Sequence, residues 1–164
     1  MKVAIFSDLH DDLPNLDIFL SQIKQYQVKS LIFCGDLSNL KTLHYLCQNF
    51  TDSIYLVGGN ADSFDEYDTR KIKNLIYNKY KLEFNLDNQK ILVAHKPTDL
   101  KKILAEGNQG FDFAFYGHTH KPWLLRQDGL IMANPGTLRE PAGKSSFALL
   151  DSKTGNLELK ILTD

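Results

Sequence analysis

The sequence predicts a mixed α/β fold in which two packed sheets are covered by helices. In the first half, strand-like and helix-like segments alternate, which favours parallel strand pairing with right-handed crossovers. In the second half, three turn signals each separate two strand-like segments, which predicts antiparallel hairpins. Several strand-like segments are apolar along their whole length, and two sheets packed together would bury both of their faces.

The first half predicts three buried strands and two helices. Residues 2–7, 30–34 and 54–58 are β-branched or aromatic runs and are expected to be the strands. Between them, apolar residues recur at helical spacing from Leu13 to Tyr26 and from Leu40 to Cys47. Pro14 suits the first turn of the first of these helices.

The second half predicts hairpins around Asp87-Asn88, Asp128-Gly129 and residues 153–156. The paired strands are residues 80–86 with 90–95, 123–127 with 130–133, and 146–152 with 157–162. A helix from near Pro97 to Gly107 and a buried strand over 111–117 complete the set.

Composition is that of one globular domain spanning residues 1–164. The formal net charge is −1, from 19 basic and 20 acidic residues, which gives no global attraction to nucleic acid or anionic lipid. No apolar run approaches the roughly 20 residues of a membrane span, and the N-terminus is too polar for a signal peptide. We therefore expect a cytoplasmic protein, in which Cys34 and Cys47 are buried thiols, because their spacing fits no zinc or redox motif.

Side chains that carry an oxygen or imidazole ligand atom follow five of the apolar strands within about three residues. They are Asp8 and His10, Asp36, Asn60, His95, and His118 with His120. The remaining histidine, His44, falls inside a predicted helix and is expected to be solvated. Ligands of sheet-based folds bind at the carboxyl ends of strands.

Each of these signals is weak alone, since a single strand-end Asp commonly caps a turn. Together they predict a metal site with more than one ion, because crowded carboxylates and imidazoles repel or desolvate one another unless cations offset the cost. Imidazole, carboxylate and amide oxygen without thiolates suit Mn²⁺, Fe or Zn²⁺ in a catalytic role.

The motifs Asp-x-His, Gly-Asp, Gly-Asn-x-Asp, a strand-end His and Gly-His-x-His, in this order, resemble those of the calcineurin-like metallophosphoesterases. The likeness covers nearly the whole chain and is greatest to the small YfcE-type phosphodiesterases, whose Asn-Pro-Gly loop is similar to residues 134–136. It implies a four-layer αββα sandwich of two mixed sheets flanked by helices, with two divalent metal ions. Mn²⁺ is expected first, with Fe, Zn²⁺ or Ni²⁺ as alternatives.

The resemblance also implies roles for the strand-end residues. One metal would take Asp8, His10, Asp36 and His120, and the other Asp36, Asn60, His95 and His118, so that Asp36 bridges. A hydroxide shared by the ions would attack phosphorus, which makes Asp36, Asn60, His95 and His118 the catalytic set. Asp62 would support a ligand, while Asn60, Asn134 and Arg139 would contact the substrate.

Two positions depart from the family pattern in ways that bear on chemistry. Ala61 stands where many larger relatives have a histidine that can protonate the leaving group, a contribution typically worth 10²–10⁴-fold. Lys96 follows His95 where glycine is frequent, and either contacts a substrate phosphate or is solvated.

The expected function is hydrolysis of a small phosphodiester, with specificity from the loops after Asp11, over residues 63–70 and after Asn134. A phosphomonoesterase or nucleotide pyrophosphatase of the same fold is the near alternative. A non-catalytic scaffold like a retromer subunit is the distant alternative. Exposed sheet edges could support a homodimer.

Overall fold

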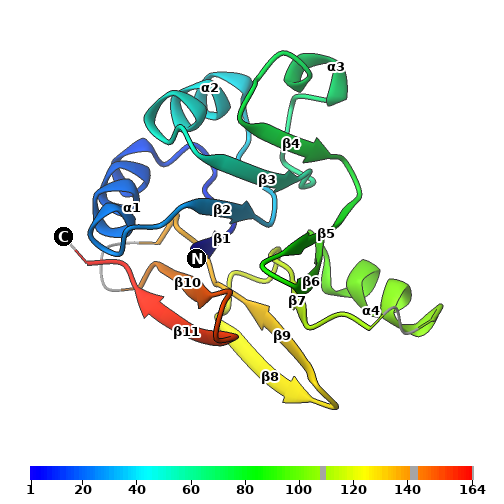
Figure 1. The fold of residues 1–164 in the computed structure, drawn as a ribbon. Helices are drawn as coiled ribbons and strands as arrows, with labels where there is room; N and C mark the ends of the chain where they lie inside the picture. Colours follow the sequence, from blue (N-terminus) through cyan, green and yellow to red (C-terminus); the bar gives the residue numbers. More distant parts are fainter. Residues whose placement is uncertain (108–109, 141–143, 164) are drawn as a thin grey trace.

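The structure is a computed structural model, and it describes residues 1–107, 110–140 and 144–163. Its first sheet has the strand order β11-β10-β1-β2-β3-β4 (Figure 1). The strands are β1 (Lys2–Phe6), β2 (Ser30–Phe33), β3 (Ser53–Val57), β4 (Leu75–Asn78), β10 (Ser146–Asp151) and β11 (Asn156–Ile161). Strands β1 to β4 are parallel, while β10 is antiparallel to both β1 and β11.

The second sheet has the order β5-β6-β7-β9-β8 and is also mixed. Its strands are β5 (Lys81–Leu86), β6 (Gln89–Ala94), β7 (Phe113–Phe115), β8 (Trp123–Gln127) and β9 (Leu130–Asn134). The hairpins β5–β6 and β8–β9 are antiparallel, and β7 lies parallel between β6 and β9. The predicted sandwich of two mixed sheets with helices is therefore confirmed.

Helices cover the outer faces of the two sheets (Figure 1). They are α1 (Leu13–Gln25), α2 (Leu40–Asn49), the single-turn α3 (Glu66–Thr69) and α4 (Pro97–Ala105). At the start of α1, the carboxylate of Asp12 accepts a hydrogen bond from the backbone amide of Asn15. At the start of α2, the side-chain oxygen of Asn39 accepts one from the backbone amide of Thr42. None of the helices in the described ranges is long and apolar enough to cross a membrane.

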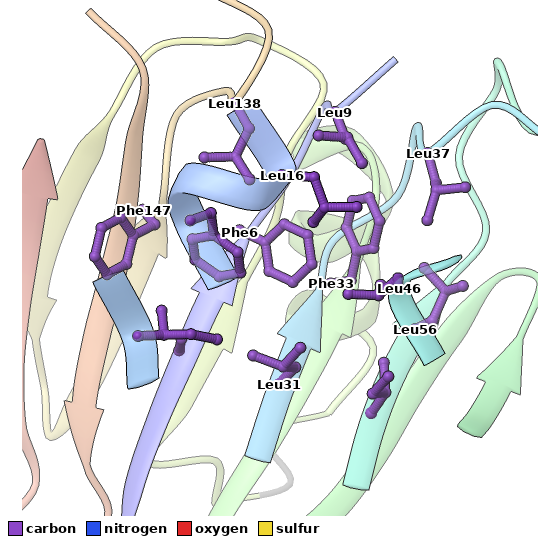
Figure 2. Close-up of a cluster of buried hydrophobic side chains, with 14 of the residues drawn as sticks. Phe6, Leu9, Leu16, Leu31, Phe33, Leu37, Leu46, Leu56, Leu138 and Phe147 are labelled. Carbon is purple, nitrogen blue, oxygen red and sulfur yellow. The ribbon is translucent and has the colours of Figure 1, made fainter. Parts of the chain in front are cut away.

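Side chains of β1 alternate between two cores, which places this strand at the centre of the layered fold. Ala4 and Phe6 face α1 and α2, while Val3 and Ile5 face the second sheet. Figure 2 shows the first of these cores, where Phe6 stacks on Phe33 with ring centroids 4.2 Å apart. A third, smaller core lies beneath α4. The central strands are thus fixed on both faces, so the residues that follow them start from rigid positions.

Most elements match the sequence prediction, with two additions. Strand β4 and helix α3 were not predicted; each has four residues, and β4 is only partly buried at the edge of its sheet. Both cysteines are free and buried, as predicted, with Cys34 between the sheets and Cys47 on the buried face of α2. His44 is exposed on α2, also as predicted.

Candidate metal centre

The seven candidate ligands all follow the carboxyl ends of central strands. Asp8 and His10 follow β1, Asp36 follows β2 and Asn60 follows β3 in the first sheet, while His95 follows β6 and His118 and His120 follow β7 in the second. Backbone contacts bring the two sets of loops together, since the amide of His118 donates to the carboxylate of Asp8 at 3.0 and 3.2 Å. The site therefore lies across the same end of both sheets.

Left-handed backbone is concentrated at this end of the sandwich. Five of the seven candidates have positive φ, namely Asp8 (53°), His10 (47°), Asp36 (61°), His118 (67°) and His120 (58°). This conformation is uncommon for residues other than glycine and clusters at functional sites, where the surrounding structure imposes it. This backbone conformation is thus part of the geometry that brings the ligand atoms of each group within 4.8 Å of one another.

Two glycines allow the loops to approach one another. A Cβ atom at Gly59 would collide with the amide and the carboxylate of Asp36. A Cβ atom at Gly117 would collide with the hydroxyl of Ser7 and lie 2.8 Å from the Asp8 carboxylate. Both positions therefore require glycine, because any side chain there would collide with atoms packed around Asp8 and Asp36.

The ligand atoms form two neighbouring groups. In the first group, Asp8, His10 and His120 each offer one donor atom, all within 4.8 Å of one another; Asp36, His95 and His118 do the same in the second. The Nε2 atom of His120 lies 3.3 Å from the Asp8 carboxylate and 3.4 Å from Nε2 of His10. The side-chain oxygen of Asn60 lies 3.1 Å from Nε2 of His95, at the edge of the second group.

Asp36 lies between these two groups. Its Oδ2 atom is 3.4 Å from Nε2 of His95 and 3.8 Å from Nε2 of His10. Its Oδ1 atom accepts from the backbone amide of Ala61 at 2.7 Å, which fixes the orientation of the carboxylate. Burial alone would raise the pKa of Asp36, but the contact with His95, the hydrogen bond from the Ala61 amide and the nearby imidazoles lower it.

His95 is held with one ring nitrogen turned toward Asp36 and Asn60. Its Nδ1 atom lies 2.7 Å from the carbonyl oxygen of Cys34, which can only accept, so Nδ1 carries the proton. The Nε2 lone pair of the neutral ring is then directed into the site, as in metal-binding histidines whose other nitrogen is bound to a carbonyl. Burial lowers the pKa of His95, but Asp36 and the Cys34 carbonyl outweigh it and raise the pKa.

The first group is electrostatically costly in the protein alone. Asp8 is fully buried, and burial raises its pKa despite the hydrogen bond from Ser7 and the charge of His120. Burial also lowers the pKa of His10, against the opposing effect of Asp36 and Asp8. Both directions mean that the site disfavours charge on its own residues, the condition that a bound cation relieves.

The donor set fits divalent cations. The two groups and Asn60 together provide two carboxylates, four imidazoles and one amide oxygen, with the Asn60 oxygen 3.1 Å from Nε2 of His95. No thiolate is among the ligands, so the chemistry suits a catalytic rather than a structural ion.

Several residues position the loops without joining the two groups. The Asp62 carboxylate accepts from the amides of Leu37, Ser38 and Gly59 at 2.7–2.8 Å, which ties the Asp36 loop to the Asn60 loop. Sequence reasoning assigned Asp62 a supporting role, and the structure shows it contacting backbone amides of these loops.

Asn134 is buried and its side chain makes hydrogen bonds within the protein, although the sequence suggested a substrate contact. Its Nδ2 atom donates to the Gly117 carbonyl and the Thr119 hydroxyl, both at 2.9 Å, and its Oδ1 atom accepts from the amide of Gly136. This arrangement positions the loop that carries His118 and His120. Thr137, which sequence reasoning missed, donates to the Asp8 carbonyl at 2.7 Å.

Arg139 is exposed beside the first group, where its positive charge contributes to the lowered pKa of His10. Its backbone amide donates to the Thr137 hydroxyl at 3.1 Å, so the loop that holds Asp8 also places Arg139. Asn60 is exposed as well, at the opposite end of the site beside His95.

Known proteins are similar to this chain in sequence and in fold. The chain is 28% identical over 145 residues to phosphodiesterase MJ0936 of Methanocaldococcus jannaschii, covering 83% of each protein. It is 28% identical over 158 residues to the probable metallophosphoesterase YsnB of Bacillus subtilis, covering 92% of this chain and 83% of YsnB. A solved archaeal phosphodiesterase superposes with a TM-score of 0.85 at 24% identity, over 99% of this chain and 100% of the other.

Residues 1–155 match the calcineurin-like phosphoesterase superfamily domain, which includes every strand-end residue of the candidate centre. The chain therefore belongs to the calcineurin-like phosphoesterase superfamily.

Proposed function

We propose that this protein is a phosphodiesterase that works with two divalent metal ions, of which Mn²⁺ is the first expectation. The observation that carries the proposal is the placement of Asp36 Oδ2, which lies 3.4 Å from His95 in one group and 3.8 Å from His10 in the other. A carboxylate has enough lone pairs to serve two ions at once. The similarity to a named phosphodiesterase supports the same reading.

The chain's own residues divide the work between holding and positioning. Asp8, His10 and His120 would hold one ion, and Asn60, His95 and His118 the other, with Asp36 common to both. When bound, such a pair of ions supplies a polarised water as nucleophile and offsets the charge of the phosphoryl oxygens. The guanidinium of Arg139, whose charge acts on His10, would meet a phosphate oxygen at that end of the site.

The loop over residues 59–62 offers no side chain that could protonate the leaving group from position 61. Ala61 contributes only its backbone amide, and that amide is bonded to Asp36. The protein should therefore favour diesters with good leaving groups, since a missing general acid costs most when the leaving oxygen is basic.

The proposal is tested with purified protein supplied with Mn²⁺. Hydrolysis of bis(p-nitrophenyl) phosphate should exceed that of p-nitrophenyl phosphate, which separates a diesterase from a monoesterase. Asp36→Ala should lower diester turnover by at least about a hundredfold and reduce the bound metal measured by mass spectrometry. The matched control is Asp17→Ala, which removes an exposed carboxylate of α1 that accepts from the Tyr45 hydroxyl and belongs to neither ligand group.

Three results would count against the proposal. Full turnover by Asp36→Ala would contradict the bridging role of that carboxylate. Faster hydrolysis of the monoester would favour the phosphomonoesterase alternative. Two bound metals without any ester hydrolysis would favour the non-catalytic scaffold.

A further inference from the structure

A cleft of about 590 Å³ opens directly beside the second ligand group, a size typical of small-molecule sites. Asn60 and His95, two of the candidate ligands, are among the residues that line it. One wall is the turn between β4 and β5, with Lys79, Tyr80 and Lys81, and the other is α4 with the preceding Lys96. A substrate whose phosphate lies at the metal centre would thus have one of its arms in this cleft.

One wall presents an aromatic ring to solvent on a fixed turn. Tyr80 is 73% exposed, and the amides of Tyr80 and Lys81 both donate to the side chain of Asn78, at 2.9 and 3.1 Å. The turn packs closely on the end of β3, since a Cβ atom at Gly58 would lie 2.9 Å from the Lys79 carbonyl oxygen. The backbone that carries the exposed ring is therefore fixed before any ligand arrives, which lowers the entropy cost of placing the ring against one.

The same cleft is rich in positive charge. Four lysines line it, Lys79, Lys81, Lys96 and Lys102, against the two carboxylates of Asp99 and Glu106. Lys81 pairs with Glu83 at 2.6 Å and Lys102 with Glu106 at 3.9 Å. Within the described ranges, Lys79 and Lys96 have no carboxylate within ion-pair distance. Lys79 belongs to the turn between β4 and β5, where its Nζ atom lies 5.8 Å from the centroid of the Tyr80 ring, and Lys96 directly precedes α4. The cleft therefore has positive charge on both of its walls.

We propose that this cleft binds the nucleoside phosphate portion of the substrate, so that the protein acts on small nucleotide-derived phosphodiesters. The base would stack on Tyr80, and phosphate oxygens would lie near Lys79 and Lys96. The inference rests on the proposed function, and it adds the substrate class. A sugar or glycerol phosphate would leave the aromatic wall unused. A long nucleic acid would need a basic track beyond one cleft, which a chain of net charge −1 does not predict.

Binding is measured by calorimetry, with the Mn²⁺-supplied protein and adenosine 5′-monophosphate as the probe, compared with ribose 5-phosphate. Wild type should bind the nucleotide about tenfold more tightly, which is a typical effect of stacking a base on an aromatic side chain. Tyr80→Ala should remove that preference, and Tyr80→Phe should restore it. Lys79→Ala should lower the affinity for both probes by the same factor. Tyr26→Ala, which removes an exposed ring at the end of α1, should change neither affinity.

Equal affinity for the two probes in wild type, or an undiminished preference in Tyr80→Ala, would overturn the inference. So would tight binding of a thymidine oligonucleotide that the mononucleotide does not displace, which would point to a nucleic acid instead. The heats of binding do not depend on turnover. A protein that hydrolyses diesters without nucleotide preference refutes the inference alone, whereas one that prefers the nucleotide but hydrolyses no diester refutes the proposed function.

Discussion

The carboxylate of Asp62 accepts a hydrogen bond from the backbone amide of Gly59 at 2.7 Å. Its other oxygen accepts from the amides of Leu37 and Ser38, which follow Asp36 directly. One side chain therefore joins the loop after β2 to the loop after β3. The distance between Asp36 and Asn60 depends on that link, although Asp62 belongs to neither ligand group.

Replacing Asp62 by alanine should disturb the site more than the fold. The three amides lose a charged acceptor, and because Asp62 is only half-buried, water replaces part of the loss. We expect a stability loss of about 2–3 kcal/mol and a fall in metal affinity of about 10–100-fold. Urea unfolding and metal titration measure the two effects.

The matched control for Asp62 is Asp65→Ala. Asp65 also bonds backbone amides, those of Tyr67 and Asp68 at the start of α3. Losing this cap should cost about 1 kcal/mol and leave metal affinity unchanged. Equal loss of metal affinity in the two variants would mean that Asp62 has no special part in spacing the ligands.

Asn134→Ala should loosen the loop that carries His118 and His120. The buried amide is bonded to Gly117, Thr119 and Gly136, and removing it leaves the Gly117 carbonyl without this donor. We expect a stability loss of about 2–3 kcal/mol together with weaker metal binding, read by melting and by metal titration.

Asn74→Ala provides the comparison for Asn134, because Asn74 donates in the same way to the carbonyls of Cys47 and Phe50, on the helix side of the first sheet. Its stability loss should be similar, with no change in metal affinity. If Asn134→Ala binds metal as tightly as Asn74→Ala does, the positioning role of Asn134 is refuted.

The sequence predicted the arrangement of the core better than the roles of individual loop residues. The runs around Phe6 and Phe33 are apolar at every position, which is what burial on both faces requires, so the central strands could be identified. Strand β4 was not predicted, because its residues Leu75–Asn78 include polar and half-exposed positions at a sheet edge. Edge strands are short and lack the continuous apolar pattern.

At the site, residue type was predictable and geometry was not. A switch from apolar strand to Asp, Asn or His marked the seven candidates, and the structure brings all of them to one end of the sandwich. The bonded state of Asn134 and the contact of Thr137 with Asp8 depend on loops distant in sequence. The cleft at Tyr80 lies outside the three loops that the sequence suggested for specificity, because no local pattern shows which turn will border His95.

Adding metal should stabilise the protein strongly. The buried carboxylate of Asp8 and the close imidazoles are held near one another at a cost that cations would offset. Ligand at a thousand times its dissociation constant adds about 4 kcal/mol, which corresponds to a rise in melting temperature of about 10 °C for a chain of this length.

The shift is measured by calorimetry with chelator and then with excess Mn²⁺. Asp36→Ala should lose most of the shift, whereas Asp17→Ala should keep it. A wild-type melting temperature that chelator and Mn²⁺ leave unchanged would argue against an ion at either ligand group.

Neither cysteine should react in the folded protein. Burial raises the pKa of Cys47 to about 12 and that of Cys34 well above its ordinary value, so almost no thiolate forms at pH 8. Ellman's reagent should label no thiol in the native state and 2 after unfolding, the full cysteine content of the chain. Rapid native labelling of either thiol would contradict the buried positions.

The same raised pKa predicts a loss of stability in alkali. The unfolded thiol ionises above its ordinary pKa of 9.0, while folded Cys47 keeps its proton until about 12. Stability from this group is therefore complete below pH 9 and falls as pH rises toward 12, by at most about 1.4 kcal/mol per pH unit. Urea midpoints between pH 8 and pH 11 should decline less steeply for Cys47→Ala than for wild type, because the substitution removes one of the ionising groups. Parallel declines in the two proteins would show that Cys47 does not contribute to alkaline unfolding.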